Sequence, residues 1–193
     1  MPAYKMNRRV RAKEALMTLE EYLRTPESVL PQELIYGSLR VADAPLPQHQ
    51  RAVAQLFRAL DEHVTKHALG EVWLSPIDVI LDAERHLVVQ PDLLFISAAR
   101  GGIVTDRIRG GPDLVVEVLS PRPRIGAIEE RIGWFAAYGV DECWIVDLFA
   151  RRLEVVGFRN KVVDERHTFS GRLPIRSRVL PAFSQRLIGI FDY

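Results

Sequence analysis

The chain has 193 residues, of which 48% are hydrophobic and 26% charged, as in an ordinary globular protein. Its 26 Lys and Arg against 25 Asp and Glu leave a net charge of +1, so any phosphate-binding role must depend on local clusters of charge. The single cysteine, Cys143, excludes a disulfide scaffold and a cysteine-built zinc site, and it indicates a reducing, cytoplasmic compartment.

The chain shows neither a membrane span nor a secretory signal. Its apolar runs fall short of the roughly 18 consecutive residues that a span needs, so we expect no membrane partner. Residues 1–16 are basic but lack the apolar segment of a secretory signal. We therefore predict a flexible basic tail over residues 1–16, with a nucleic-acid-binding arm as the alternative, and a single domain over residues 17–193.

The first part of the chain predicts a helix, a hairpin and a long helix. A capping box over residues 18–21 opens a short helix that ends before Pro26. Residues 33–41 are typical of two short strands around a glycine. Over residues 47–69 the apolar side chains recur with a helical period, and Gly70 is the expected C-terminal stop.

Strand patterns follow Gly70. Short apolar runs predict strands over residues 72–74, 77–81, 87–89, 93–96, 114–119, 144–146 and 153–156. We expect a loop over residues 100–111, a helix over residues 125–138 that Gly139 ends, and edge strands or loops in the C-terminal tail. This order predicts a fold of the α/β class, of mixed α+β type, in which helices flank one mixed central sheet.

Acidic residues embedded in apolar strands are the unusual feature of the sequence. Glu117 lies among five aliphatic residues, where an isolated carboxylate is too costly to bury. Asp92 opens another apolar strand, and Asp78 lies inside the run 77–81. Acids from neighbouring strands that meet at one edge of a sheet form an oxygen site suited to Mg²⁺ or Mn²⁺. Such a cation activates water and polarises a phosphodiester.

Each acid also has a structural interpretation. Glu117 is alternatively half of an ion pair with an arginine, Asp92 a turn cap after a proline, and Asp78 an edge or face-alternation residue. The five histidines show no metal-ligand spacing beyond His63 and His67, and a solvated helix face explains that pair.

Five segments share their order and spacing with a known family. They are residues 32–37 (QELIYG), 47–50 (PQHQ), 89–94 (VQPDLL), 111–121 (GPDLVVEVLSP) and 138–147 (YGVDECWIVD). Together they resemble the Uma-type family of restriction-endonuclease-like proteins, a branch of the PD-(D/E)XK nuclease superfamily. The resemblance extends from about residue 18 to about residue 156.

The resemblance implies a restriction-endonuclease-like PD-(D/E)XK core, a small mixed sheet with helices on both sides and an active site at one end. Asp92 and Glu117 match the motif acids that hold Mg²⁺ or Mn²⁺, and Glu33 matches an acid from the N-terminal region. The motif lysine is replaced by Arg131, and the family's acid four positions earlier falls on Ala127. Arginine keeps the positive charge, but it cannot release its proton at ordinary pH.

Four arginines near these motifs are candidates for binding backbone phosphates. Arg107, Arg109, Arg122 and Arg124 offer guanidinium forks, and a solubilising arginine-rich loop is the alternative. We therefore predict a Mg²⁺-dependent endonuclease, impaired by the loss of the lysine, with DNA as the expected partner and a homodimer as the expected assembly. The alternative is an inactive family member that binds nucleic acid or a protein.

Overall fold

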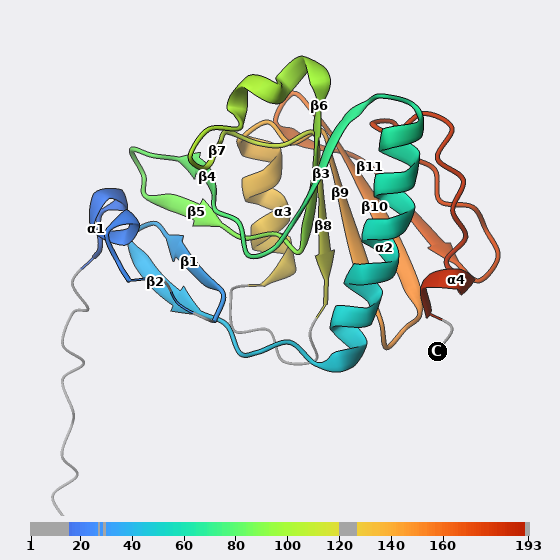
Figure 1. The fold of residues 1–193 in the computed structure, drawn as a ribbon, viewed down its shortest axis with the longest axis horizontal. Helices are drawn as coiled ribbons and strands as arrows, with labels where there is room; N and C mark the ends of the chain where they lie inside the picture. The colour runs from blue at the N-terminus through green and yellow to red at the C-terminus, as the bar shows by residue number, and fades with distance from the viewer. Residues whose placement is uncertain (1–15, 27, 29, 120–126, 192–193) are drawn as a thin grey trace, which may run out of the picture.

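The computed structural model describes residues 16–26, 28, 30–119 and 127–191 (Figure 1). Its helices are α1 (Leu19–Leu23), α2 (Pro47–Lys66), α3 (Ile128–Ala137) and α4 (Ile188–Phe191), with a 3₁₀ helix at Ala98–Ile103. Its strands are β1 (Gln32–Ile35), β2 (Ser38–Val41), β3 (Gly70–Leu74), β4 (Val79–Asp82), β5 (Leu87–Val89), β6 (Leu93–Ser97), β7 (Ile108–Arg109), β8 (Leu114–Val118), β9 (Glu142–Asp147), β10 (Arg152–Arg159) and β11 (Val162–Ser170). None of the helices in these residues has both the length and the apolar character needed to cross a membrane.

The strands in this part of the chain form two mixed sheets. The larger has the order β11-β10-β9-β8-β6-β3, and its only parallel pair is β8 with β9. The smaller has the order β2-β1-β5-β4-β7, in which β4 and β7 run parallel. The predicted mixed α/β class, with helices flanking mixed sheet, is confirmed, and the strands divide between two sheets. The short strands of residues 32–41 and 79–89 pair with one another instead of extending the larger sheet.

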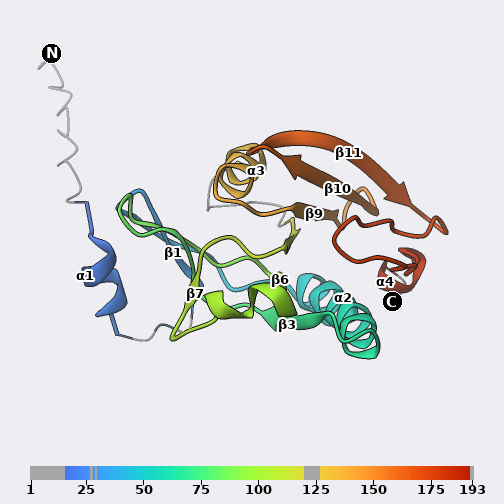
Figure 2. The same cartoon turned by 90° about the horizontal axis from the view of Figure 1, so that it is seen from above.

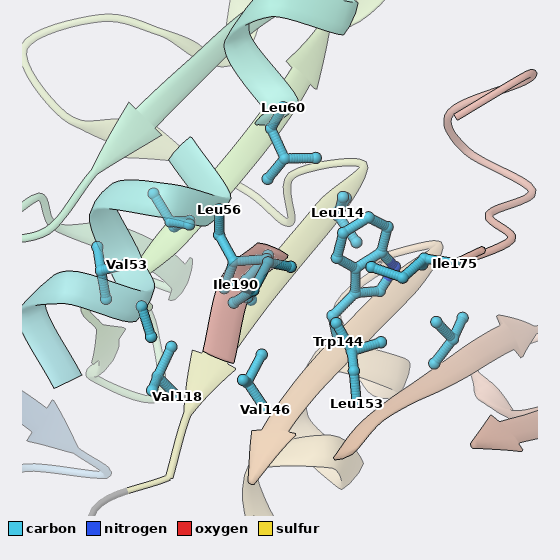
Figure 3. Close-up of a cluster of buried hydrophobic side chains, with 14 of the residues drawn as sticks. Val53, Leu56, Leu60, Leu114, Val118, Trp144, Val146, Leu153, Ile175 and Ile190 are labelled. Atoms are coloured by element: carbon cyan, nitrogen blue, oxygen red, sulfur yellow. The ribbon is translucent and has the colours of Figure 1, made fainter. Parts of the chain in front are cut away.

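Helices cover both faces of the larger sheet. Residues of α2 and α4 pack with Leu114, Val116 and Val118 on one face. On the other face, Val115 packs with α3 and with side chains of the smaller sheet. Figure 1 shows α2 and α3 on either side of β8, and Figure 2 shows β1 and β11 at opposite ends of the molecule. Figure 3 shows Val53 and other α2 side chains facing the larger sheet.

Local sequence signals explain the first elements. Thr18 and Glu21 form the predicted capping box at the start of α1. Tyr36 and Gly37 both have positive φ, 50° and 86°, which closes the tight turn between β1 and β2. Helix α3 ends as expected before Gly139, whose φ is 83°. The expected start of that helix at residues 125–126 lies outside the described residues.

The end of α2 differs from the expectation. The helix ends at Lys66, and Ala68 takes the left-handed conformation with φ 52°, so Gly70 is not its stop. Gly70 is the first residue of β3, with φ 150°. A Cβ atom at this position would lie 2.1 Å from the carbonyl oxygen of Ile96 in the neighbouring β6. Gly70 is therefore required by a close backbone approach and by its own φ angle.

We expect Gly70→Ala to lower the free energy of unfolding by about 2–5 kcal/mol, because both the φ angle and the contact with Ile96 must relax. Gly133→Ala is the matched control, since nothing lies within 4 Å of its added Cβ atom and Gly133 is exposed in α3. This control should be neutral or stabilising by about 0.5–1 kcal/mol. Urea unfolding of both variants measures the difference, and equal stability of the two would contradict the assignment.

Candidate functional site

Two acids lie next to each other where β6 pairs with β8. In this antiparallel pair Leu93 lies opposite Val116, so Asp92, just before β6, lies across from Glu117. Glu117 alternates with Val116 and Val118, which face α2, so its side chain lies on the α3 face. Oδ2 of Asp92 accepts a hydrogen bond of 2.7 Å from the backbone N–H of Val118. The two acids thus occupy neighbouring positions at one end of the sheet.

The guanidinium of Arg131 links Glu117 to Glu33. Arg131 comes from the first turns of α3, and its Nε and Nη2 donate to Oε1 of Glu117 at 3.0 and 2.5 Å. Its Nη1 donates to Oε2 of Glu33, in β1, at 2.7 Å. The side chains of Arg131 and Glu33 are 7% and 1% exposed, so these ion pairs are shielded from water. One guanidinium therefore joins α3 to both sheets.

A second network holds Glu33 from the other side. Oε1 of Glu33 accepts from the backbone N–H of Gln90 at 2.7 Å, and Nε2 of Gln90 donates to Oδ1 of Asp78 at 2.9 Å. Asp78 also accepts from the Tyr22 hydroxyl at 2.9 Å and from Nε of Arg107 at 3.1 Å. Asp78 precedes β4 and is not within a strand as expected from the sequence. It is a structural hydrogen-bonding residue that is connected to Glu33 through Gln90.

The charges at the site do not balance. Glu33, Asp92 and Glu117 carry three carboxylates, and Arg131 carries one guanidinium. Burial raises the pKa of Glu117; Arg131 lowers it, and the charges of Asp92 and Glu33 raise it again, to about 7. Burial alone would lower the pKa of Arg131, but the two glutamates raise it, so the arginine stays charged. The site therefore has a surplus of negative charge that a further cation or a proton can compensate.

Two carboxylate oxygens of the site remain available to a divalent cation. Among the described residues, no three acidic, histidine or cysteine side chains converge into a metal-binding group. Both oxygens of Glu33 are engaged, by Gln90 and Arg131. Oε2 of Glu117 and Oδ1 of Asp92, in contrast, accept no hydrogen bond from any residue of the described segments. Mg²⁺ commonly binds one or two carboxylates and keeps several waters, so these two oxygens are suitable ligands for it, whereas Glu33 has no oxygen left.

A buried histidine completes the site. His49, in the first turn of α2, is 7% exposed, and its Nε2 lies 3.1 Å from the carbonyl oxygen of Val118 and 3.4 Å from Oδ2 of Asp92. Burial lowers the pKa of His49, but the hydrogen bond and charge of Asp92 outweigh burial and raise it. The sequence reasoning did not select this residue. Its only signal was its place in the segment 47–50, because its partners come from distant parts of the chain.

Two of the predicted phosphate-binding arginines, Arg107 and Arg109, lie outside this cluster. Arg107 bonds to Asp78, and Arg109 forms an exposed pair with Asp106 at 3.0 Å. Arg122 and Arg124 lie outside the described residues, as do residues 1–15 of the predicted tail. The structure therefore brings Glu33, Asp92, Glu117 and Arg131 together. Arg107 is connected to this cluster by a chain of hydrogen bonds that runs through Asp78 and Gln90 to Glu33.

The raised pKa of Glu117 makes stability depend on pH. Between 4.5, its ordinary value, and about 7, the folded chain binds more protons at this carboxyl than the unfolded chain does. The stability that this difference supplies is complete below pH 4.5 and is lost as the pH rises through about 7. We expect the free energy of unfolding of the wild type to fall relative to Glu117→Gln across this range. Urea titrations at several pH values measure it, with exposed Glu62→Gln as the control; a pH-independent difference would contradict the assignment.

Comparison with known proteins agrees with the geometry. The Uma2 family, described as "Putative restriction endonuclease", matches residues 19–187. A solved structure from Anabaena variabilis ATCC 29413, described as a putative nuclease belonging to DUF820, superimposes with a TM-score of 0.77. The alignment covers 91% of this chain and 98% of that one at 17% sequence identity, which establishes the fold. No curated protein matches the sequence.

The family match spans both sheets, α2, α3 and all four residues of the acid and arginine cluster. The fold is accordingly restriction-endonuclease-like, as the resemblance implied. The chain belongs to the Uma2 family.

Proposed function

We propose that this chain is a divalent-metal-dependent endonuclease that hydrolyses DNA phosphodiesters, slowed because arginine replaces the motif lysine. The observation that carries the proposal is the pair Asp92 and Glu117, each with one oxygen not engaged by the described residues, in a site with surplus negative charge. Membership of a family described as restriction endonucleases supports nucleic acid as the substrate.

The residues have distinct roles in this proposal. Asp92 and Glu117 would hold Mg²⁺ or Mn²⁺, which lowers the pKa of water and stabilises developing negative charge on phosphate oxygens. Arg131 keeps Oε1 of Glu117 in place and adds fixed positive charge, but it accepts no proton. Glu33 holds Arg131 through a buried ion pair. Glu33 and Arg131 are therefore positioning residues here.

Nucleic acid would reach the site along arginine-bearing segments. The side chains of Arg107 and Arg109 are 41% and 46% exposed, so each can contact a phosphate without leaving the surface. Arg107 is also connected to Glu33 through Asp78 and Gln90. Arg122 and Arg124, in the sequence between β8 and α3, complete the proposed set. Because these contacts are electrostatic, binding should weaken as salt concentration rises.

We expect the purified chain to nick or cleave plasmid DNA with Mn²⁺ or Mg²⁺, and Asp92→Asn to reduce the rate at least about 100-fold, since the cation loses one of two charged ligands. Gel analysis of timed reactions measures the rates. Asp61→Asn, an exposed acid of α2, is the control and should match the wild type. Cleavage that persists in Asp92→Asn would remove the assignment.

One observation favours a second function, binding of nucleic acid without hydrolysis. Arg131 makes three hydrogen bonds, which engage Oε1 of Glu117 and Oε2 of Glu33. Ala127, at the N-cap of α3, supplies no acid at the position where the family resemblance expects one. A guanidinium cannot act as a base, so these two substitutions together remove proton-handling groups from the site.

Arg131→Lys distinguishes the two functions. If the arginine limits turnover, we expect the lysine variant to cleave DNA at least about tenfold faster, because an amine releases its proton more readily than a guanidinium. If the chain only binds, both proteins should retain salt-dependent binding in filter or fluorescence assays and show no cleavage with any divalent ion. Far-UV circular dichroism checks that the variant is folded.

A further inference from the structure

His49 is a buried polar residue whose presence is not explained by packing. It lies on the buried face of α2 with Val53, which packs in the same apolar cluster as Val118 of β8. Its Nδ1 atom is buried and has no hydrogen-bond partner among the described residues. A buried nitrogen without a partner destabilises a fold by about 1–3 kcal/mol. An apolar side chain would avoid that loss. The presence of an imidazole therefore indicates a functional role for its other nitrogen, Nε2.

The polar atoms around Nε2 indicate what this role is. Both polar atoms near it, the carbonyl oxygen of Val118 at 3.1 Å and Oδ2 of Asp92 at 3.4 Å, only accept hydrogen bonds when Asp92 is ionised. Nε2 must therefore carry a proton, whether the ring is neutral or charged. His49 donates its Nε2–H to the carbonyl oxygen of Val118 at the end of β8, and the same nitrogen lies 3.4 Å from one oxygen of Asp92.

This donor restrains the carboxylate of Asp92. A terminal carboxylate rotates in a broad, two-fold torsional well, so its two oxygens exchange easily unless one is held. Oδ2 receives the backbone N–H of Val118 at 2.7 Å and faces Nε2 of His49. Oδ1 receives no donor from the described residues. Because Val118 and His49 both contact Oδ2, Oδ1 is the oxygen of Asp92 that remains available to a ligand.

We propose that His49 is a positioning residue for cation binding, which holds Oδ2 of Asp92 so that Oδ1 is presented together with Oε2 of Glu117. This role rests on the proposed metal-dependent function. It complements the role of Arg131, since Arg131 holds Glu117 whereas His49 lies against Asp92. Donors that orient a metal ligand in this way typically contribute 10–100-fold to metal affinity.

Three variants test the role in the full chain without DNA. His49→Gln places an amide nitrogen near the position of Nε2, His49→Asn places one near Nδ1, and His49→Leu removes both. Binding of Mn²⁺ alone is measured by electron paramagnetic resonance of the free ion. We expect His49→Gln to stay within about threefold of the wild type, and His49→Asn and His49→Leu to bind at least about tenfold more weakly. His67→Leu, at the exposed far end of α2, should bind like the wild type.

The outcomes separate the two proposals. If wild type binds Mn²⁺, Asp92→Asn does not, and His49→Leu keeps full affinity, His49 has no positioning role and the metal site stands. If the wild type itself binds no Mn²⁺, the metal-dependent function falls and this inference falls with it. Thermal unfolding without metal is measured alongside. A variant that loses stability but keeps its affinity for Mn²⁺ would mark His49 as structural only. Lost affinity in His49→Asn together with retained affinity in His49→Gln supports the proposal.

Discussion

The structure depends on burying two carboxylates, those of Glu117 and Glu33, around one guanidinium. Arg131 is hydrogen-bonded to Glu117 in the larger sheet and to Glu33 in the smaller one, and all three side chains are largely shielded from water. Removing one partner of such a buried pair typically costs about 3–5 kcal/mol, because the remaining charge is left unpaired. The contact between α3 and the two sheets is therefore fixed by charge as well as by apolar packing.

The same arrangement determines what the site can do. One guanidinium cannot neutralise three carboxylates, so the buried carboxyl of Glu117 is held in a state that favours a nearby cation or a proton. Arg131 reduces the surplus and orients Glu117, but it contributes no exchangeable proton. In the proposed nuclease, arginine in place of the motif lysine would supply positive charge but no exchangeable proton, so water would have to carry the proton transfer.

Some local signals in the sequence are confirmed by the structure, and others are not. The apolar run around Glu117 indicated a strand buried on both faces, and the proline before Asp92 marked the start of its strand. Residue spacing alone suggested Gly70 as a helix stop, yet its role comes from Ile96 in a neighbouring strand. His49 was passed over for a similar reason, since isolated histidines on a helix carry no local signal.

The sequence by itself determined the types of the elements, the mixed α/β class and the placement of two acids in apolar strands. These features depend on side-chain periodicity and turn residues, which act over a few positions. The tertiary structure decided which groups meet. Glu33 and Arg131 are 98 positions apart, and His49 and Val118 are 69 apart. Their contacts follow from how two sheets and two helices pack, so no local pattern could indicate that Glu33 would hold an arginine rather than a metal.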